Sequence, residues 1–103
     1  MDERDKLIAS VKEAVYEISP NADIILFGSR SRGDYTEESD WDFLILIDQE
    51  ATEALKQRIW KRLFYVELES NKAISSIIHS KKEWEKREIT HFYKNVASEG
   101  ISV

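Results

Sequence analysis

The sequence contains no cysteine, one proline and three glycines among its 103 residues, and no long uninterrupted apolar stretch. The absence of cysteine excludes disulfide bonds and thiolate metal sites, and it is consistent with a reducing compartment. Because proline is scarce while 42% of the residues are hydrophobic and 11% aromatic, the composition argues against a disordered chain. Without a run of about 20 apolar residues or a signal-peptide pattern, we expect a soluble, cytoplasmic protein with no membrane association.

Positive charge is also in short supply, since the formal net charge is −5. Binding of a nucleic-acid backbone requires clustered Lys and Arg, so we expect no extended nucleic-acid surface. Residues 56–62 and 81–87 do carry several cations. These cations alternate with apolar residues at helical spacing, which is typical of solvated helix faces.

The hydrophobic pattern divides the chain into helical and extended segments without a linker between them. Apolar residues at steps of three and four predict helices, and short β-branched runs predict strands. In chain order these are a helix over residues 2–18, strands over 24–27 and 41–47, a helix from 50 to about 69, a strand over 72–79, and short helices over 81–87 and 91–98. The chain length predicts one domain spanning residues 1–103.

The strand over residues 41–47 follows an aspartate and contains a second one. Side chains two residues apart in a strand share a face, so Asp40 and Asp42 are expected on one face together with Leu44 and Leu46. The opposite face carries the intervening apolar side chains Trp41, Phe43, Ile45 and Ile47. The two carboxylates would then lie side by side, with Cα atoms roughly 6.5–7 Å apart.

A second group of polar residues follows the strand over residues 24–27. Gly28 permits a tight turn and close approach to a ligand, Ser29 offers a hydroxyl and an N–H, and a helix beginning there would present further donors to an anion. Asp40 and Asp42 supply hard oxygen ligands suited to Mg²⁺, which commonly binds carboxylates together with substrate phosphates. Gly-Ser and Asp-x-Asp at this spacing should occur by chance about once in 10⁵ starting positions.

At these residues the chain resembles the minimal nucleotidyltransferases of the DNA polymerase β superfamily. Their signature is Gly-Ser, ten residues, then Asp-x-Asp before an apolar strand, and it is matched here by Gly28, Ser29, Asp40, Asp42 and residues 43–47. The frequent family residues Arg30, Arg32 and Gly33 are present between the two halves. The resemblance extends from the first helix to about residue 79, roughly three-quarters of the chain.

The resemblance implies an α/β (α+β) nucleotidyltransferase fold, a small mixed β-sheet with helices packed mainly on one side. It also implies that Asp40 and Asp42 are catalytic residues that bind Mg²⁺ or Mn²⁺, and that Gly28 and Ser29 bind a nucleoside triphosphate. The implied reaction transfers a nucleotidyl group, AMP from ATP, to a hydroxyl and releases pyrophosphate. Metal ions bridging phosphate oxygens lower the charge barrier to attack at the α-phosphorus.

Arg32 has two interpretations. Its fork of donors suits a triphosphate, and on that ground we expect it to bind the nucleotide. A surface arginine in an acidic loop also pairs with its neighbours, here Asp34, Glu37 or Glu38.

The family usually places a third carboxylate on a neighbouring strand, and the strand over residues 72–79 contains no acid. Ser75 and Ser76 occupy its middle. Glu67 or Glu69 would reach the metal site if the preceding helix ended early; otherwise they are ordinary surface glutamates. His79 and His91 lack the ligand spacing of a metal site.

Two functions follow. The first is a metal-dependent nucleotidyltransferase whose acceptor hydroxyl lies on a partner protein, because so short a chain leaves acceptor recognition to a partner or a homo-oligomer. The resemblance points to a small helical partner of the HEPN type, encoded beside the enzyme as toxin and antitoxin. The alternative is a non-catalytic, antitoxin-like binding module that keeps the fold to hold this partner, and the missing acid supports it.

Overall fold

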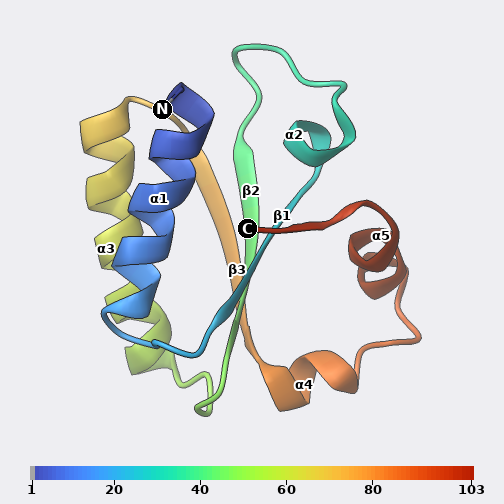
Figure 1. Ribbon diagram of the computed structural model, residues 1–103. Coiled ribbons are helices and arrows are strands. Elements are labelled where there is room, and N and C mark those ends of the chain that lie inside the picture. Colours follow the sequence, from blue (N-terminus) through green and yellow to red (C-terminus); the bar gives the residue numbers. More distant parts are fainter. Residues whose placement is uncertain (1) are drawn as a thin grey trace.

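The computed structural model describes residues 2–103 and contains a four-stranded mixed sheet with the strand order β3-β2-β1-β4 (Figure 1). The strands are β1 (Asp23–Phe27), β2 (Trp41–Ile47), β3 (Ile74–Ser80) and β4 (Ile101–Ser102). β1 runs antiparallel to both β2 and β4, whereas β2 and β3 are parallel. The two strands expected at residues 24–27 and 41–47 are therefore adjacent, as the motif requires.

Helices cover both faces of this sheet (Figure 1). The two long helices, α1 (Glu3–Tyr16) and α3 (Glu53–Ser70), lie together on one face. The short helices α2 (Ser29–Arg32), α4 (Lys81–Glu85) and α5 (His91–Glu99) lie on the other side. The expected fold class is confirmed, with the two long helices together on one side.

Most of the helices begin at a side-chain cap that the sequence supplies. The carboxylate of Asp2 and the hydroxyls of Thr52, Ser80 and Thr90 accept hydrogen bonds from backbone N–H groups in the first turns of α1, α3, α4 and α5. Such a cap satisfies a donor that has no partner within the helix. None of the helices within residues 2–103 has the length and apolar character needed to cross a membrane.

β2 is the central strand and is buried on both faces. Phe43, Ile45 and Ile47 pack into a larger core with α1 and α3. Leu44 and Leu46 pack into a smaller core with Trp84 of α4 and Val96 of α5. The alternation expected for this strand is thus confirmed, and it places residue 42 on the face that α2, α4 and α5 share.

The helices and strands agree with the expected segments apart from shifts of a few residues at their ends. The sequence did not predict β4, which contains only two residues and pairs with β1 through Ile25 and Leu26. So short a strand has no periodicity of its own. It forms because α5 returns the chain to the free edge of β1.

Candidate active site

The turn between β1 and α2 is shaped by Gly28. This residue has φ 76° and ψ −158°, a region that favours glycine, and it caps the start of α2. A Cβ placed on Gly28 would also overlap the Oδ2 atom of Asp42. Glycine is therefore required here both for the backbone conformation and for the close approach to Asp42.

The register of the sheet brings the two halves of the motif together. Phe27, the last residue of β1, lies opposite Asp42 in β2, so the turn at Gly28 begins beside this carboxylate. Asp40 directly precedes β2 and is exposed, whereas Asp42 is half-buried. Gly28, Ser29, Asp40 and Asp42 thus meet at one end of the β1–β2 pair, as the sequence predicted.

Asp42 has an unusual charge environment. Burial is the main reason why the pKa of Asp42 is raised, and the negative charge of Asp40 raises it further. The positive charge of Arg32 acts in the opposite direction. A cation stabilises a half-buried carboxylate that is repelled by an exposed one nearby, so Asp42 and Asp40 fit a divalent metal ion.

Arg32 lies close enough to influence Asp42, but it also has acidic partners. Its guanidinium forms ion pairs with Asp34 at 3.4 Å and with Glu99 of α5 at 3.2 Å. The pair with Asp34 matches the surface interpretation, and the pair with Glu99 was not anticipated. Since Glu99 is 67 residues away in the chain, no local pattern could have revealed it.

Ser75 occupies the position beside Asp42 on the neighbouring strand. Asp42 pairs with Ser75 in the parallel register of β2 and β3, and Ser75 is exposed. Ser76 pairs with Phe43 and lines a pocket with Trp60 and Phe64 on the α3 side of the sheet. An acid placed directly beside Asp42 on β3 would therefore stand at residue 75 and not at residue 76.

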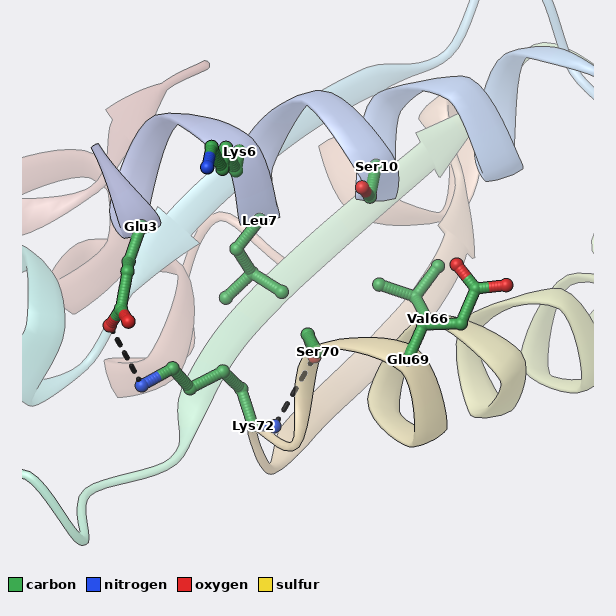
Figure 2. A pocket seen from close by; sticks show the side chains of 8 residues that line it. All are labelled: Glu3, Lys6, Leu7, Ser10, Val66, Glu69, Ser70 and Lys72. Carbon is green, nitrogen blue, oxygen red and sulfur yellow. Dashed lines mark hydrogen bonds and ion pairs between the residues drawn. The ribbon is translucent and has the colours of Figure 1, made fainter. Parts of the chain in front are cut away.

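The hypothesis that Glu67 or Glu69 reaches the metal site is wrong. Glu67 accepts a hydrogen bond at 2.6 Å from the N–H of Ile74, the first residue of β3. Glu69 lines a groove between α1 and α3 (Figure 2). These two helices cover the face of the sheet opposite to the one that carries Asp42. The helix α3 continues to Ser70, so it does not end early enough to turn either glutamate toward the carboxylates.

Within residues 2–103, no group of three or more His, Cys, Asp or Glu side chains is arranged to hold a metal ion. His79 instead stacks on Trp84 with ring centroids 6.0 Å apart. Burial lowers the pKa of His79, and the charges of Arg87 and Lys56 lower it further. The chain itself therefore offers a cation two carboxylates, which suits Mg²⁺ bound together with substrate phosphates.

Comparison with known proteins connects this geometry to one family. A family model described as "Nucleotidyltransferase domain" matches residues 8–98. Two proteins of Methanocaldococcus jannaschii are similar in sequence. "Putative protein adenylyltransferase MJ0141" is 48% identical over 58 residues, 56% of this chain and 59% of that protein. "Putative protein adenylyltransferase MJ0604" is 39% identical over 77 residues, 75% of this chain and 72% of that protein.

A solved structure has a similar fold. It is described as the crystal structure of "the toxin-antitoxin with AMP-PNP", and it superposes with a TM-score of 0.65 over 99% of this chain and 72% of that chain. The sequences are 16% identical. At this identity, the likeness establishes the fold.

Proposed function

The chain belongs to the nucleotidyltransferase domain family, and from this premise we propose that it is an enzyme that transfers an adenylyl group from ATP to a hydroxyl of a partner protein. The observation that carries the proposal is the register that pairs Phe27 with Asp42. This pairing sets the Gly28 turn beside two carboxylates. A turn suited to phosphate and a pair of hard oxygen ligands are therefore available to one bound nucleotide.

We assign the triphosphate to Gly28, Ser29 and Arg32. The absence of a side chain at Gly28 lets phosphate oxygens approach the backbone, and the N–H and hydroxyl of Ser29 donate to them. The hydroxyl of Ser31 donates to the carbonyl oxygen of Gly28 at 2.9 Å, so it stabilises the turn itself. Arg32 donates to the phosphates when it exchanges its acidic partners for the more highly charged nucleotide.

Asp40 and Asp42 hold Mg²⁺ or Mn²⁺ in this proposal. When bound, the cation neutralises charge on the phosphate oxygens and on the leaving pyrophosphate. The raised pKa of Asp42 reflects an unfavourable charge that a cation relieves. Asp42 therefore binds the metal ion in competition with a proton.

The relatives support the choice of adenylyl group and acceptor. Their names describe protein adenylyltransferases, and the structural neighbour is a toxin–antitoxin with AMP-PNP. This chain spans 59% and 72% of the lengths of the two relatives. On this basis we propose that the partner protein is the other component of a toxin–antitoxin pair. This partner carries the acceptor hydroxyl.

The direct test is incubation of the chain with ATP labelled at the α-phosphate, Mg²⁺ and the product of the adjacent gene. We expect label to be transferred to that protein, and omission of Mg²⁺ to abolish the transfer. Calorimetry with ATP at millimolar concentration, with and without the partner, measures the binding step separately. If neither transfer nor metal-dependent binding is observed, the enzymatic proposal fails.

Matched variants distinguish the proposed roles. Asp40→Asn and Asp42→Asn should each abolish Mg²⁺-dependent binding, because each removes an anionic ligand and keeps the shape. Ser29→Ala should weaken binding by only about 0.5–1.5 kcal/mol, the usual contribution of one neutral hydrogen bond. Asp48→Asn is the control, since Asp48 follows β2 at its other end and pairs with Lys81.

One observation favours a second function. The position beside Asp42 on β3 is occupied by Ser75 rather than by an acid, so a catalytic base at this place is lacking. The alternative is a non-catalytic module that holds its partner through the same fold. Binding of the partner without metal-dependent binding of ATP would establish this alternative.

A further inference from the structure

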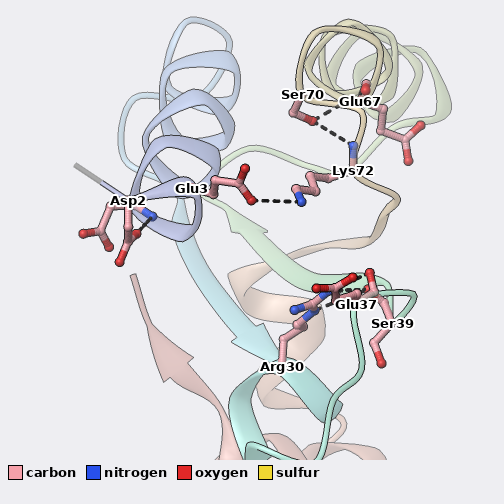
Figure 3. Close-up of polar contacts among 9 residues, drawn as sticks. Asp2, Glu3, Arg30, Glu37, Ser39, Glu67, Ser70 and Lys72 are labelled. Atoms are coloured by element: carbon pink, nitrogen blue, oxygen red, sulfur yellow. Dashed lines mark hydrogen bonds and ion pairs between the residues drawn. The ribbon is translucent and has the colours of Figure 1, made fainter.

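Arg30 makes a set of contacts that neither the motif nor the proposed function assigns. It follows Ser29 in α2, and its side chain is half-buried. Its Nε and Nη2 atoms donate to the carbonyl oxygen of Ser39 at 3.3 and 3.1 Å, and Nη2 also donates to the carbonyl oxygen of Glu37 at 3.3 Å. Figure 3 shows this side chain directed toward the loop backbone at Glu37 and Ser39.

The same guanidinium is in contact with two aromatic rings. Its Cζ atom lies 4.4 Å from the centre of the Tyr35 ring and 4.5 Å from the centre of the Trp41 ring. Trp41 is 6% exposed and packs in the larger core, whereas Tyr35 is 51% exposed. A planar guanidinium stacks on such rings while its edge donates hydrogen bonds, and an ammonium group lacks this combination.

These contacts lie on both sides of Asp40 in the sequence. The carbonyl group of Ser39 comes directly before Asp40, and Trp41 comes directly after it. Within residues 2–103, the remaining hydrogen bonds of residues 34–39 are internal, between Thr36 and Ser39 and between Thr36 and Glu38, apart from the pair of Asp34 with Arg32. Among the described residues, Arg30 is therefore the main link between this exposed loop and α2.

We propose that Arg30 is a positioning residue that holds Asp40 in its metal-binding place by fixing residues 34–40 to α2. The inference rests on the proposed function, because it concerns a ligand of the proposed metal site. It assigns to Arg30 a role different from that of Arg32. One arginine of the motif orders the loop, and the other faces the nucleotide.

The geometry separates Arg30 from the reacting groups. Trp41 packs on the α1 and α3 side of the sheet, and the side chain of Asp42 points to the other side, because adjacent residues of a strand face opposite ways. The Nε and Nη2 atoms of Arg30 also donate to backbone carbonyl oxygens of the loop. Arg30 therefore acts through the loop rather than on the triphosphate.

The test compares Arg30→Lys, which keeps the charge but loses the planar fork, with the wild-type chain. Nitrogen-15 relaxation of the backbone amides of residues 34–40 reports loop order without any requirement for activity. We expect these amides to become more mobile in the variant, and those of β1 to remain unchanged. We also expect the Mg²⁺ concentration for half-maximal ATP binding to rise about 10–100-fold, as for other residues that orient metal ligands.

Two further variants control this experiment. Tyr35→Leu removes one ring at a half-exposed position, should fold even if Arg30→Lys does not, and should change both measurements in the same direction by a smaller amount. Arg4→Lys is the matched control, because Arg4 lines the same pocket as Arg30, Tyr35 and Trp41 and, among residues 2–103, forms its ion pair with exposed Asp5. It should leave both measurements unchanged.

Contrary outcomes are distinguishable. Unchanged loop order in Arg30→Lys and Tyr35→Leu overturns the inference, as does full retention of the wild-type Mg²⁺ dependence by Arg30→Lys. Loss of ATP affinity at saturating Mg²⁺ with an ordered loop would instead make Arg30 a nucleotide ligand. If the wild-type chain itself shows no Mg²⁺-dependent binding, the proposed function fails, and the loop order alone then decides whether Arg30 positions Asp40.

Discussion

At the scale of single residues, Gly28 and Asp42 depend on each other. The space that a Cβ of residue 28 would occupy is taken by the carboxylate of Asp42. The glycine therefore permits the carboxylate to stand against the turn. In that position burial and Asp40 disfavour its ionised form, and the raised pKa of Asp42 expresses this cost.

We predict that Asp42→Asn stabilises the metal-free protein at neutral pH. Because the pKa of Asp42 is raised above its ordinary value of 3.8, the folded state binds the proton more tightly than the unfolded state does. The protonated form of Asp42 therefore contributes to the free energy of unfolding. This contribution is fully present below the ordinary pKa and is lost as the pH rises through the higher folded-state pKa. Urea unfolding without Mg²⁺ should show the variant to be more stable at pH 7 and the two proteins to converge at acid pH.

Addition of Mg²⁺ and ATP provides the control for this prediction. The wild-type chain should be stabilised, because a ligand that binds only the folded state raises the free energy of unfolding. Asp42→Asn should show no such gain. A variant that is less stable than the wild-type chain at pH 7 would contradict the proposed cost of ionising Asp42.

Gly28→Ala should both destabilise the fold and abolish metal-dependent binding of ATP. The backbone conformation of Gly28, with φ 76° and ψ −158°, alone costs an alanine about 1–3 kcal/mol, and the new Cβ also displaces the carboxylate of Asp42. Gly33→Ala is a matched control, since Gly33 has φ 92° but nothing within 4 Å of an added Cβ. Chemical denaturation and calorimetry should show strain in both variants but loss of binding only in Gly28→Ala.

At the scale of elements, the connection between α3 and β3 determines what stands beside the carboxylates. Asn71 caps the end of α3 in a left-handed conformation with φ 58°. The carboxylate of Glu67, in the last turn of α3, accepts a hydrogen bond from the N–H of Ile74. This hydrogen bond joins the end of the helix to the first residue of the strand. β3 then pairs with β2 so that Ser75 lies beside Asp42.

Glu67→Ala is therefore expected to lower the free energy of unfolding by about 1.5–3 kcal/mol, the usual contribution of a hydrogen bond to a charged group. Glu69→Ala, two residues later on an exposed part of the same helix, should change it by less than about 0.5 kcal/mol. Urea denaturation of the two variants measures both values. Equal effects would show that the contact with Ile74 contributes nothing specific.

At the scale of the whole molecule, the sheet separates a structural side from a side that carries the candidate site. The larger core lies between the sheet and the pair α1 and α3, and the smaller core lies under α4 and α5. The Arg32–Glu99 ion pair links α2 to the end of α5 on the second side. A residue of the last helix thus contacts Arg32 beside the candidate site.

Ser75→Asp tests whether the missing acid limits turnover. If the wild-type chain binds ATP but transfers label slowly, a carboxylate at this position should strengthen Mg²⁺ binding and increase transfer to the partner protein. Ser76→Asp is the control, because residue 76 faces Trp60 and Phe64 of α3. It should give no gain in metal binding or transfer, because it adds the carboxylate on the other face of the sheet from Asp42.

An equal increase of transfer in Ser75→Asp and Ser76→Asp would contradict the placement of the third acid. A gain in metal affinity without any gain in transfer would instead show that the acid is not what limits the reaction. Labelled ATP and calorimetry, applied to both variants, separate these outcomes.

The local patterns of the sequence were sufficient to predict the long helices, the three longer strands and the two halves of the motif. Strand alternation placed the side chains of Asp42 and Phe43 on opposite faces of the sheet, because successive side chains of any strand face opposite ways. Cap residues such as Thr52 and Thr90 begin helices through bonds that span only three residues. These features depend on neighbours in the chain, so they can be predicted without knowledge of the fold.

Only the tertiary structure decided which residues meet across the sheet and its connections. Ser75 rather than Ser76 stands beside Asp42 because of the parallel register of β2 and β3, and a shift of one residue would exchange the two faces. The partners of Glu67 and Arg30, and the pairing of Arg32 with Glu99, likewise depend on how helix ends and loops pack. Register and packing arise from the burial of the whole core, so no short segment of sequence contains them.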